Sequence, residues 1–108
     1  MASEQDLDEL RAVCEGAKMM SEGGCEFAYL PQIKIPHAGG TIVRDALLCL
    51  QQRDGYLTRL YLSEQVPGRG NNWTSHRILD RAWHTWSWNH VPADRPAVVL
   101  AQHLRALR

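Results

Sequence analysis

The segment Ala46–Leu50 constrains the fold most strongly, because its five residues are all apolar. A strand with one face in water alternates apolar and polar side chains, whereas a strand covered on both faces is apolar throughout. The segment lies within a predicted strand over residues 41–51. We therefore expect this strand to lie in the middle of a sheet.

Two further predicted strands flank the central one. Residues 26–35 and residues 56–63 both alternate apolar and polar side chains. Turn sequences join the three strands, Ala38-Gly39-Gly40 before the central one and Arg53-Asp54-Gly55 after it. These features predict an antiparallel meander. In its first strand, the alternation places on one face Phe27, Tyr29, Ile33 and Ile35.

A helix is predicted at each end of the chain. In the first, Ser3 and Asp6 resemble a capping box, and Gly23-Gly24 would end the helix. Its apolar residues recur at three- and four-residue intervals: Leu7, Leu10, Val13, Ala17 and Met20. In the last, Asp94 is the predicted N-cap and Pro96 a first-turn residue. The apolar side of this last helix is formed by Val99, Leu100, His103, Leu104 and Leu107.

The region between the meander and the last helix begins with turn-forming residues 66–72. Two short strands are predicted after it, over residues 73–79 and 82–88, joined at Asp80-Arg81. The whole chain, residues 1–108, is thus predicted to be one α+β domain. Its expected order is an N-terminal helix, an antiparallel meander of three to five strands, and a C-terminal helix.

Composition narrows the class of function. The 108 residues contain 12 Lys and Arg against 12 Asp and Glu, so the basic excess of a nucleic-acid-binding domain is missing. No apolar run is long enough for a membrane span, and residues 1–8 are polar and acidic where a signal peptide would be basic and then apolar. We expect a cytoplasmic protein that binds neither nucleic acid nor membrane.

The neutral total is the sum of two unlike halves. Acidic residues dominate up to Leu30, and arginines dominate from Arg53 onward. One interpretation is two solvated faces that attract each other within the fold; the other is a polar surface for a partner.

The three cysteines are Cys14, Cys25 and Cys49, an odd number without CxxC spacing, so neither a disulfide framework nor a thiolate zinc site is indicated. Cys49 lies in the apolar run, where burial makes a thiol inert. Cys25 follows the glycine pair and is expected to be the most accessible, although the neighbouring Glu26 disfavours a thiolate. Cys25 and Cys49 are therefore weak candidates for a catalytic nucleophile.

Five histidines raise the question of a metal or an acid–base group. His84 stands between Trp83 and Trp86, where it is either a neutral structural ring bonded to a backbone carbonyl or a buried acid–base residue, a third weak catalytic candidate. A metal site is an alternative built from His84, His103 and Cys25, although no histidine spacing requires it. The sequence has no P-loop and no GxGxxG motif, and we predict no cofactor.

Five strings of the sequence carry a family resemblance, over residues 45–49, 54–60, 72–73, 83–89 and 101–107. Together they resemble small bacterial ubiquitin-conjugating-enzyme-like proteins, with a UBC/RWD-like fold, from prokaryotic ubiquitin-like conjugation operons. The resemblance implies protein partners: a ubiquitin-like protein, its activating enzyme or a JAB-type metallopeptidase.

Catalytic members of that family place a thioester cysteine after the meander, yet residues 66–89 contain no cysteine. The resemblance therefore implies a non-catalytic or accessory interaction component. A partner face is expected on the loop and the tryptophan segment, at Asn72, Trp73, Trp86 and Trp88. The tryptophans could instead form a core that closes one end of the sheet. The enzymatic alternative is a carrier of the ubiquitin-like protein, with a thioester on Cys25 or Cys49.

Overall fold

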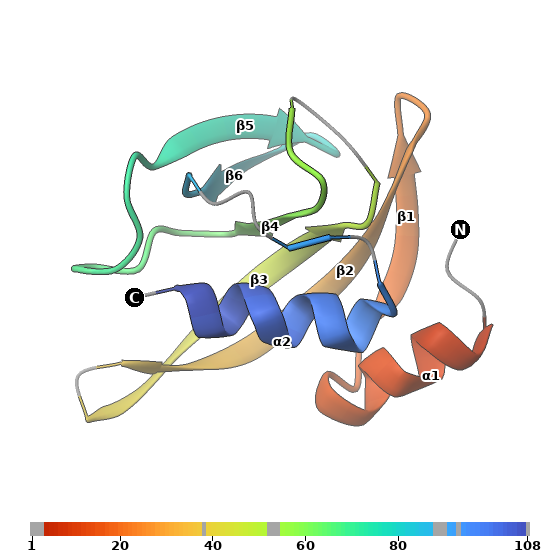
Figure 1. Cartoon of the computed structure of the whole chain (residues 1–108), viewed down its shortest axis with the longest axis horizontal. Coiled ribbons are helices and arrows are strands. Elements are labelled where there is room, and N and C mark those ends of the chain that lie inside the picture. The colour runs from red at the N-terminus through yellow and green to blue at the C-terminus, as the bar shows by residue number, and fades with distance from the viewer. Residues whose placement is uncertain (1–3, 38, 52–54, 88–90, 93, 108) are drawn as a thin grey trace.

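Figure 1 shows a computed structural model of the chain, which describes residues 4–37, 39–51, 55–87, 91–92 and 94–107. Two helices and six strands follow one another in this order: α1 (Glu4–Val13), β1 (Lys18–Glu22), β2 (Cys25–His37), β3 (Gly40–Cys49), β4 (Arg59–Leu62), β5 (Thr74–Ile78), β6 (Arg81–Thr85) and α2 (Pro96–Ala106). The α+β class and the two terminal helices are confirmed. Ser3, Arg53 and Asp54, which were predicted to cap or turn the chain, lie outside the described residues.

All strands belong to one antiparallel sheet with the order β1-β2-β3-β4-β6-β5. β3 lies between β2 and β4, and residues 46–49 are buried without exception. The prediction that the apolar run is a central strand is therefore confirmed. Three to five strands were expected, and the sheet has six, because residues 18–22 form an additional strand, β1.

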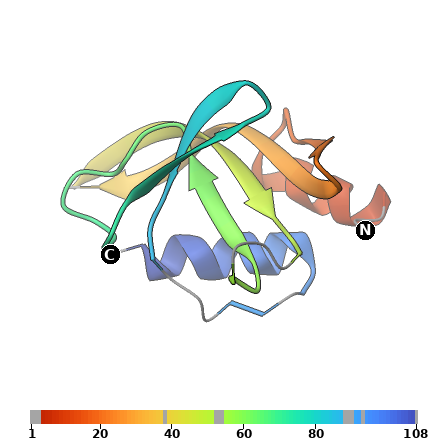
Figure 2. The same cartoon turned by 90° about the horizontal axis from the view of Figure 1, so that it is seen from above.

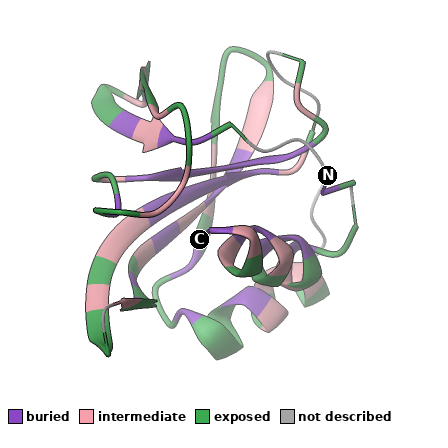
Figure 3. Ribbon diagram, turned by 60° about the vertical axis from the view of Figure 1, so that its left-hand side comes forward, coloured by how far each residue is buried: buried purple, intermediate pink, exposed green. Residues whose placement is uncertain are grey.

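Apolar side chains fill both faces of the sheet. Figures 1 and 2 show α1 and α2 on one side of β2, β3 and β4, and the β5–β6 hairpin, which continues the sheet, on the other side. A larger core, here called the helix-side core, includes Leu10 of α1, Leu48 of β3 and Val99 of α2. A smaller hairpin-side core consists of Phe27, Leu47, Cys49, Tyr61, Ile78 and Trp83. The middle strands are correspondingly buried, while the far end of the β2–β3 hairpin is exposed (Figure 3).

Polar contacts to residues of β1 and β3 hold the β5–β6 hairpin in place. The backbone N–H of Leu79 donates to Oε2 of Glu22 at 2.8 Å, and Nη2 of Arg81 donates to Oδ2 of Asp45 at 3.0 Å. Its turn is Leu79-Asp80, not Asp80-Arg81 as predicted. Both turn residues have positive φ, 53° and 60°, as a two-residue hairpin turn of the mirror-image type requires.

A bulge in β2 overturns the prediction that Phe27, Tyr29, Ile33 and Ile35 share a face. The register runs Leu30↔Ala46 and then Ile33↔Arg44, so three steps on β2 oppose two on β3. The extra residue reverses the alternation. Phe27 and Tyr29 consequently contact the hairpin-side core, whereas Ile33 and Ile35 enter the helix-side core.

The first helix is shorter than predicted. It ends at Val13, which is 66% exposed, and the chain turns through residues 14–17 into β1. Gly23 and Gly24, with φ of 58° and 81°, form the β1–β2 hairpin turn and do not end a helix. Glycine pairs suit both roles because both need positive φ.

The last helix has the predicted apolar side, with Val99, Leu100 and His103 buried. The prediction of Asp94 as its N-cap is wrong. Arg95 occupies the N-cap position without a side-chain cap, and Oδ1 of Asp94 instead accepts from the backbone N–H of Arg95 at 2.7 Å. Arg95 also forms an ion pair with Glu9, which joins the start of α2 to α1.

Candidate protein-interaction site

A groove of about 610 Å³ lies where the 66–72 loop, the residues after β6 and the last turns of α2 meet. We call it the tryptophan groove. Its lining residues are Gly70, Asn71, Trp86, Ser87, Gln102, Arg105 and Ala106. The groove therefore joins three segments that are far apart in the sequence.

Backbone contacts give the loop side of the groove a defined shape. The N–H of Arg69 donates to the carbonyl of Val66 at 3.1 Å, and the N–H of Ser87 donates to the carbonyl of Asn71 at 2.9 Å. Nε1 of Trp73 donates to the carbonyl of Arg69 at 2.7 Å. These bonds tie the loop both to itself and to the chain after β6.

Gly70 allows the loop to lie against Trp73. Its φ is +70°, and a Cβ at this position would lie 3.0 Å from the Trp73 ring. A glycine satisfies both conditions, since it tolerates positive φ and brings no side chain to the contact.

Trp86 is almost fully buried, with 3% of the residue exposed. Its ring lies 5.4 Å from that of Trp73 and 6.4 Å from that of His103, between centroids. Nε1 of Trp86 has no hydrogen-bond partner among the described residues. A buried donor without an acceptor is uncommon in folded proteins, and this nitrogen is itself covered by the surrounding packing.

The structure brings together two of the four predicted partner-binding residues. Trp73 and Trp86 are in contact, and Asn72 is exposed beside them with φ of 54°. Trp88 lies outside the described residues. Trp83 belongs to the hairpin-side core, so the three described tryptophans divide between the two faces of the sheet.

Sequence reasoning missed the α2 side of the groove. Gln102, Arg105 and Ala106 are spaced so that they lie on one side of the helix, a pattern that can be seen in the sequence. Which neighbour this side faces depends on tertiary packing, and the sequence pattern alone does not give it.

Behind the groove, His103 is held by a buried hydrogen-bond chain. Oγ1 of Thr58 donates to the carbonyl of Val91 at 2.7 Å and lies 2.8 Å from Nε2 of His103. The hydroxyl has one hydrogen, and a carbonyl can only accept it, so Nε2 of His103 must be the donor to Oγ1. Burial, together with the positive charge of Arg59, lowers the pKa of His103 to about 4. His103 is therefore a neutral structural residue at neutral pH.

The other candidate histidine has a different partner from the one expected. His84 is half-buried on β6, and its Nδ1 lies 3.0 Å from Oγ of Ser75 on β5, where a backbone carbonyl was expected.

The residues of the alternative metal site are not assembled. His84 contacts β5, His103 contacts Thr58, and Cys25 begins β2 at the β1–β2 turn. Within residues 4–37, 39–51, 55–87, 91–92 and 94–107, no three side chains of His, Cys, Asp or Glu are grouped to hold a metal ion.

The thiols differ in accessibility. Cys49 is fully buried and its Sγ donates to the carbonyl of Gln51 at 3.2 Å, while Cys25 is half-buried at the start of β2. Cys14 is buried directly after α1, and its Sγ donates to the carbonyl of Pro31 at 3.2 Å. Burial raises the pKa of the Cys14 thiol. Neither buried thiol has the exposed, positively charged surroundings that activate a nucleophile.

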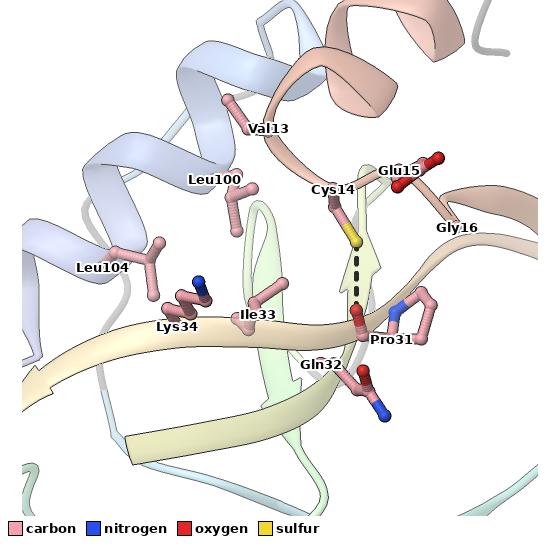
Figure 4. Close-up of a pocket in the computed structure, with 10 residues that line it drawn as sticks. All are labelled: Val13, Cys14, Glu15, Gly16, Pro31, Gln32, Ile33, Lys34, Leu100 and Leu104. Atoms are coloured by element: carbon pink, nitrogen blue, oxygen red, sulfur yellow. Dashed lines mark hydrogen bonds between the residues drawn. The ribbon is translucent and has the colours of Figure 1, made fainter. Parts of the chain in front are cut away.

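A second hollow, of about 760 Å³, lies between the end of α1, β2 and α2 (Figure 4). Val13, Leu100 and Leu104 give it an apolar side. β1 pairs with residues 25–29 of β2, and the β2 segment beside the hollow lies beyond that pairing and carries Pro31, Lys34 and Pro36. Proline and lysine on the unpaired edge of this segment oppose the addition of another strand, so we assign no partner strand to this hollow.

Comparisons with protein-family models, curated proteins and solved structures give no match for this chain. In the part of the chain that the structure describes, neither helix has the length and apolar character needed to cross a bilayer.

Proposed function

We propose that this chain is a non-catalytic protein-interaction domain, an accessory component of a bacterial ubiquitin-like protein modification system with a UBC/RWD-like fold. The observation that carries the interaction role is the tryptophan groove, an open surface with an aromatic residue in its lining and a loop fixed in shape. The sequence strings that resemble ubiquitin-conjugating-enzyme-like proteins support the assignment to such a system. A cytoplasmic location is part of the proposal.

The described cysteines support a non-catalytic role. A thioester carrier needs a thiol that the activating enzyme can reach, and Cys14 and Cys49 are 6% and 0% exposed. Cys25 is half-buried at the start of β2, so its reactivity decides between this proposal and the carrier alternative.

The first experiment measures binding by calorimetry. The full chain is titrated separately with the ubiquitin-like protein, the activating enzyme and the JAB-type peptidase encoded beside it. We expect at least one to bind, and the Arg105→Glu variant to bind it about tenfold more weakly. Val43→Glu is the matched control, because Val43 is 50% exposed on β3 and lies outside the groove. Absence of binding to all three at about 100 µM contradicts the proposal.

A second experiment separates the proposal from the carrier alternative. The chain is incubated with the activating enzyme, ATP and the ubiquitin-like protein, and the products are separated with and without reductant. We expect no reducible adduct. An adduct that disappears in Cys25→Ser or Cys49→Ser would establish the carrier function instead.

A further inference from the structure

The hollow of about 760 Å³ between the end of α1, β2 and α2, here called the α1–α2 hollow, has two unlike walls. One wall is the chain that leaves α1, with Val13 and Glu15 (Figure 4). The other wall is formed by α2 and β2, with Leu104 and Lys34. Each wall thus presents an apolar side chain and a charged side chain, and the two charges have opposite signs.

These four side chains are accessible to a second molecule. Val13 is 66% exposed, more than any other large apolar residue that the structure describes. Glu15 and Lys34 are exposed, and Leu104 is half-buried. Within the described part of the chain, neither the Glu15 carboxylate nor the Lys34 ammonium has an ion-pair or hydrogen-bond partner. Both charges are therefore available for a contact between molecules.

The wall that follows α1 is fixed in shape by its contacts with β2. Sγ of Cys14 donates to the carbonyl of Pro31 at 3.2 Å. Gly16 packs against the same proline, where a Cβ would lie 2.7 Å from Cγ of Pro31. A surface that is ordered before binding loses less conformational freedom in a complex, so this wall is suited to form an interface.

The complementarity of the two walls points to a second copy of this chain as the occupant. In a dimer with two-fold symmetry, residue i of one copy contacts residue j of the other, and j contacts i. Val13 then packs against the partner's Leu104 and Glu15 pairs with the partner's Lys34, and each contact occurs twice.

The charge of the lining agrees with this occupant. Glu15 and Lys34 are the two charged residues among the described lining residues, so the lining is neutral in total and favours neither an acidic nor a basic segment. The contacts are made by side chains. They add no strand to the edge of β2, which its prolines oppose.

We propose that the α1–α2 hollow is the interface of a homodimer with two-fold symmetry, in which the end of α1 of each copy contacts α2 and β2 of the other. The inference does not rest on the proposed function, because the α1–α2 hollow shares no lining residue with the tryptophan groove. Its failure would leave the proposed function unchanged.

Sedimentation equilibrium of the full chain measures the self-association. We expect a dimer with a dissociation constant of roughly 10–100 µM, and a protein that stays monomeric up to about 1 mM would overturn the proposal. Glu15→Lys and Lys34→Glu should each weaken dimerisation at least about tenfold, since each places like charges opposite each other twice. Arg77→Glu is the control, because Arg77 is exposed on β5 outside the hollow, and it should dimerise like the wild type. An equal loss in Arg77→Glu would also overturn the proposal.

A mixture of the two charge-reversal variants tests the symmetry. In a mixed dimer of Glu15→Lys and Lys34→Glu, the introduced lysine faces the introduced glutamate, and the native Lys34 faces the native Glu15. Both pairs are attractive, so the mixture should dimerise within about threefold of the wild-type affinity, although neither variant does so alone. This recovery would also show that both variants are folded. A mixture that remains monomeric overturns the assigned contacts.

The apolar part of the interface is tested with Val13→Ser. This variant should dimerise about tenfold more weakly, because each copy loses a buried valine. Val43→Ser is the matched control, since Val43 is 50% exposed on β3 outside the hollow, and it should have no effect. Equal affinities of Val13→Ser and the wild type would contradict the proposal.

Discussion

Oγ1 of Thr58 lies 2.8 Å from Nε2 of His103, and this hydrogen bond joins the residue before β4 to the buried side of α2. The same hydroxyl donates to the carbonyl of Val91, so three separate segments meet at one side chain. His103 is 1% exposed, and its imidazole is also in edge contact with the ring of Trp86. The packing of the groove therefore depends on a histidine that must remain neutral.

Acid should destabilise the fold through this residue. The pKa of His103 is lowered to about 4 in the folded chain, against an ordinary value of 6.5. Between these values the unfolded chain binds a proton that the folded chain does not, so stability is full above pH 6.5 and falls as the pH drops toward 4. We expect the free energy of unfolding to decrease by about 2 kcal/mol from pH 7 to pH 4.5 through this group alone.

Urea denaturation of the wild type and of His103→Leu at both pH values checks this expectation. The stability difference between the two proteins should change by that amount between pH 7 and pH 4.5. Gln102→Leu alters the same helix without removing a titratable group, and its difference from the wild type should stay constant. A constant difference for His103→Leu as well would show that His103 does not titrate as stated.

Gly70→Ala should destabilise the chain more than Gly68→Ala. Both glycines have positive φ, +70° and +73°, so each alanine would incur a backbone strain of about 1 kcal/mol. Only at Gly70 would the new Cβ lie 3.0 Å from the Trp73 ring, whereas at Gly68 nothing lies within 4 Å. We expect Gly70→Ala to lose roughly 1 kcal/mol more, measured by urea denaturation. Equal losses would mean that the loop shifts freely away from Trp73.

The sequence predicted the features that depend on local pattern. The continuous apolar run placed β3 in the middle of the sheet, and three- and four-residue spacing predicted the buried side of α2. Turn residues predicted the 66–72 loop, which the structure also shows. The partner-binding role of Trp73 and Trp86 stays a prediction, although their rings lie 5.4 Å apart between centroids. In each case a short stretch of chain contains the physical cause.

The features that were missed depend on distant contacts. Residues 18–22 extend the helical spacing of α1, and their pairing with β2 makes them a strand. The bulge in β2 is fixed by a carboxylate thirteen residues away, since Oδ1 of Asp45 accepts from the N–H of Gln32 at 2.9 Å. The contribution of Gln102 and Arg105 to the groove was missed for the same reason, because the way α2 packs on the sheet determines which residues they face.

Asp45→Ala should therefore be clearly destabilising. It removes the acceptor for Gln32, whose φ is 55°, and the ion-pair partner of Arg81 at 3.0 Å. Because the carboxylate is partly exposed, we expect a loss of about 1–2 kcal/mol on urea denaturation.

Glu64→Ala is the control for this change. Glu64 is 76% exposed and its ion pair with Arg44 spans 3.9 Å, so its removal should change stability by less than about 0.5 kcal/mol. Similar losses in the two variants would mean that Asp45 acts as an ordinary surface charge and does not hold the bulge.

Cys25 should be the one described thiol that a disulfide reagent reaches in the folded chain. Cys14 and Cys49 are 6% and 0% exposed and donate to backbone carbonyls, so their reaction requires the chain to open. Mixing the native protein with an aromatic disulfide should release one thiolate equivalent promptly, and three should be released in denaturant. Cys25→Ser should reduce the prompt release to none. A prompt equivalent that survives in Cys25→Ser would place a reactive thiol in the core positions and would reopen the carrier alternative for Cys49.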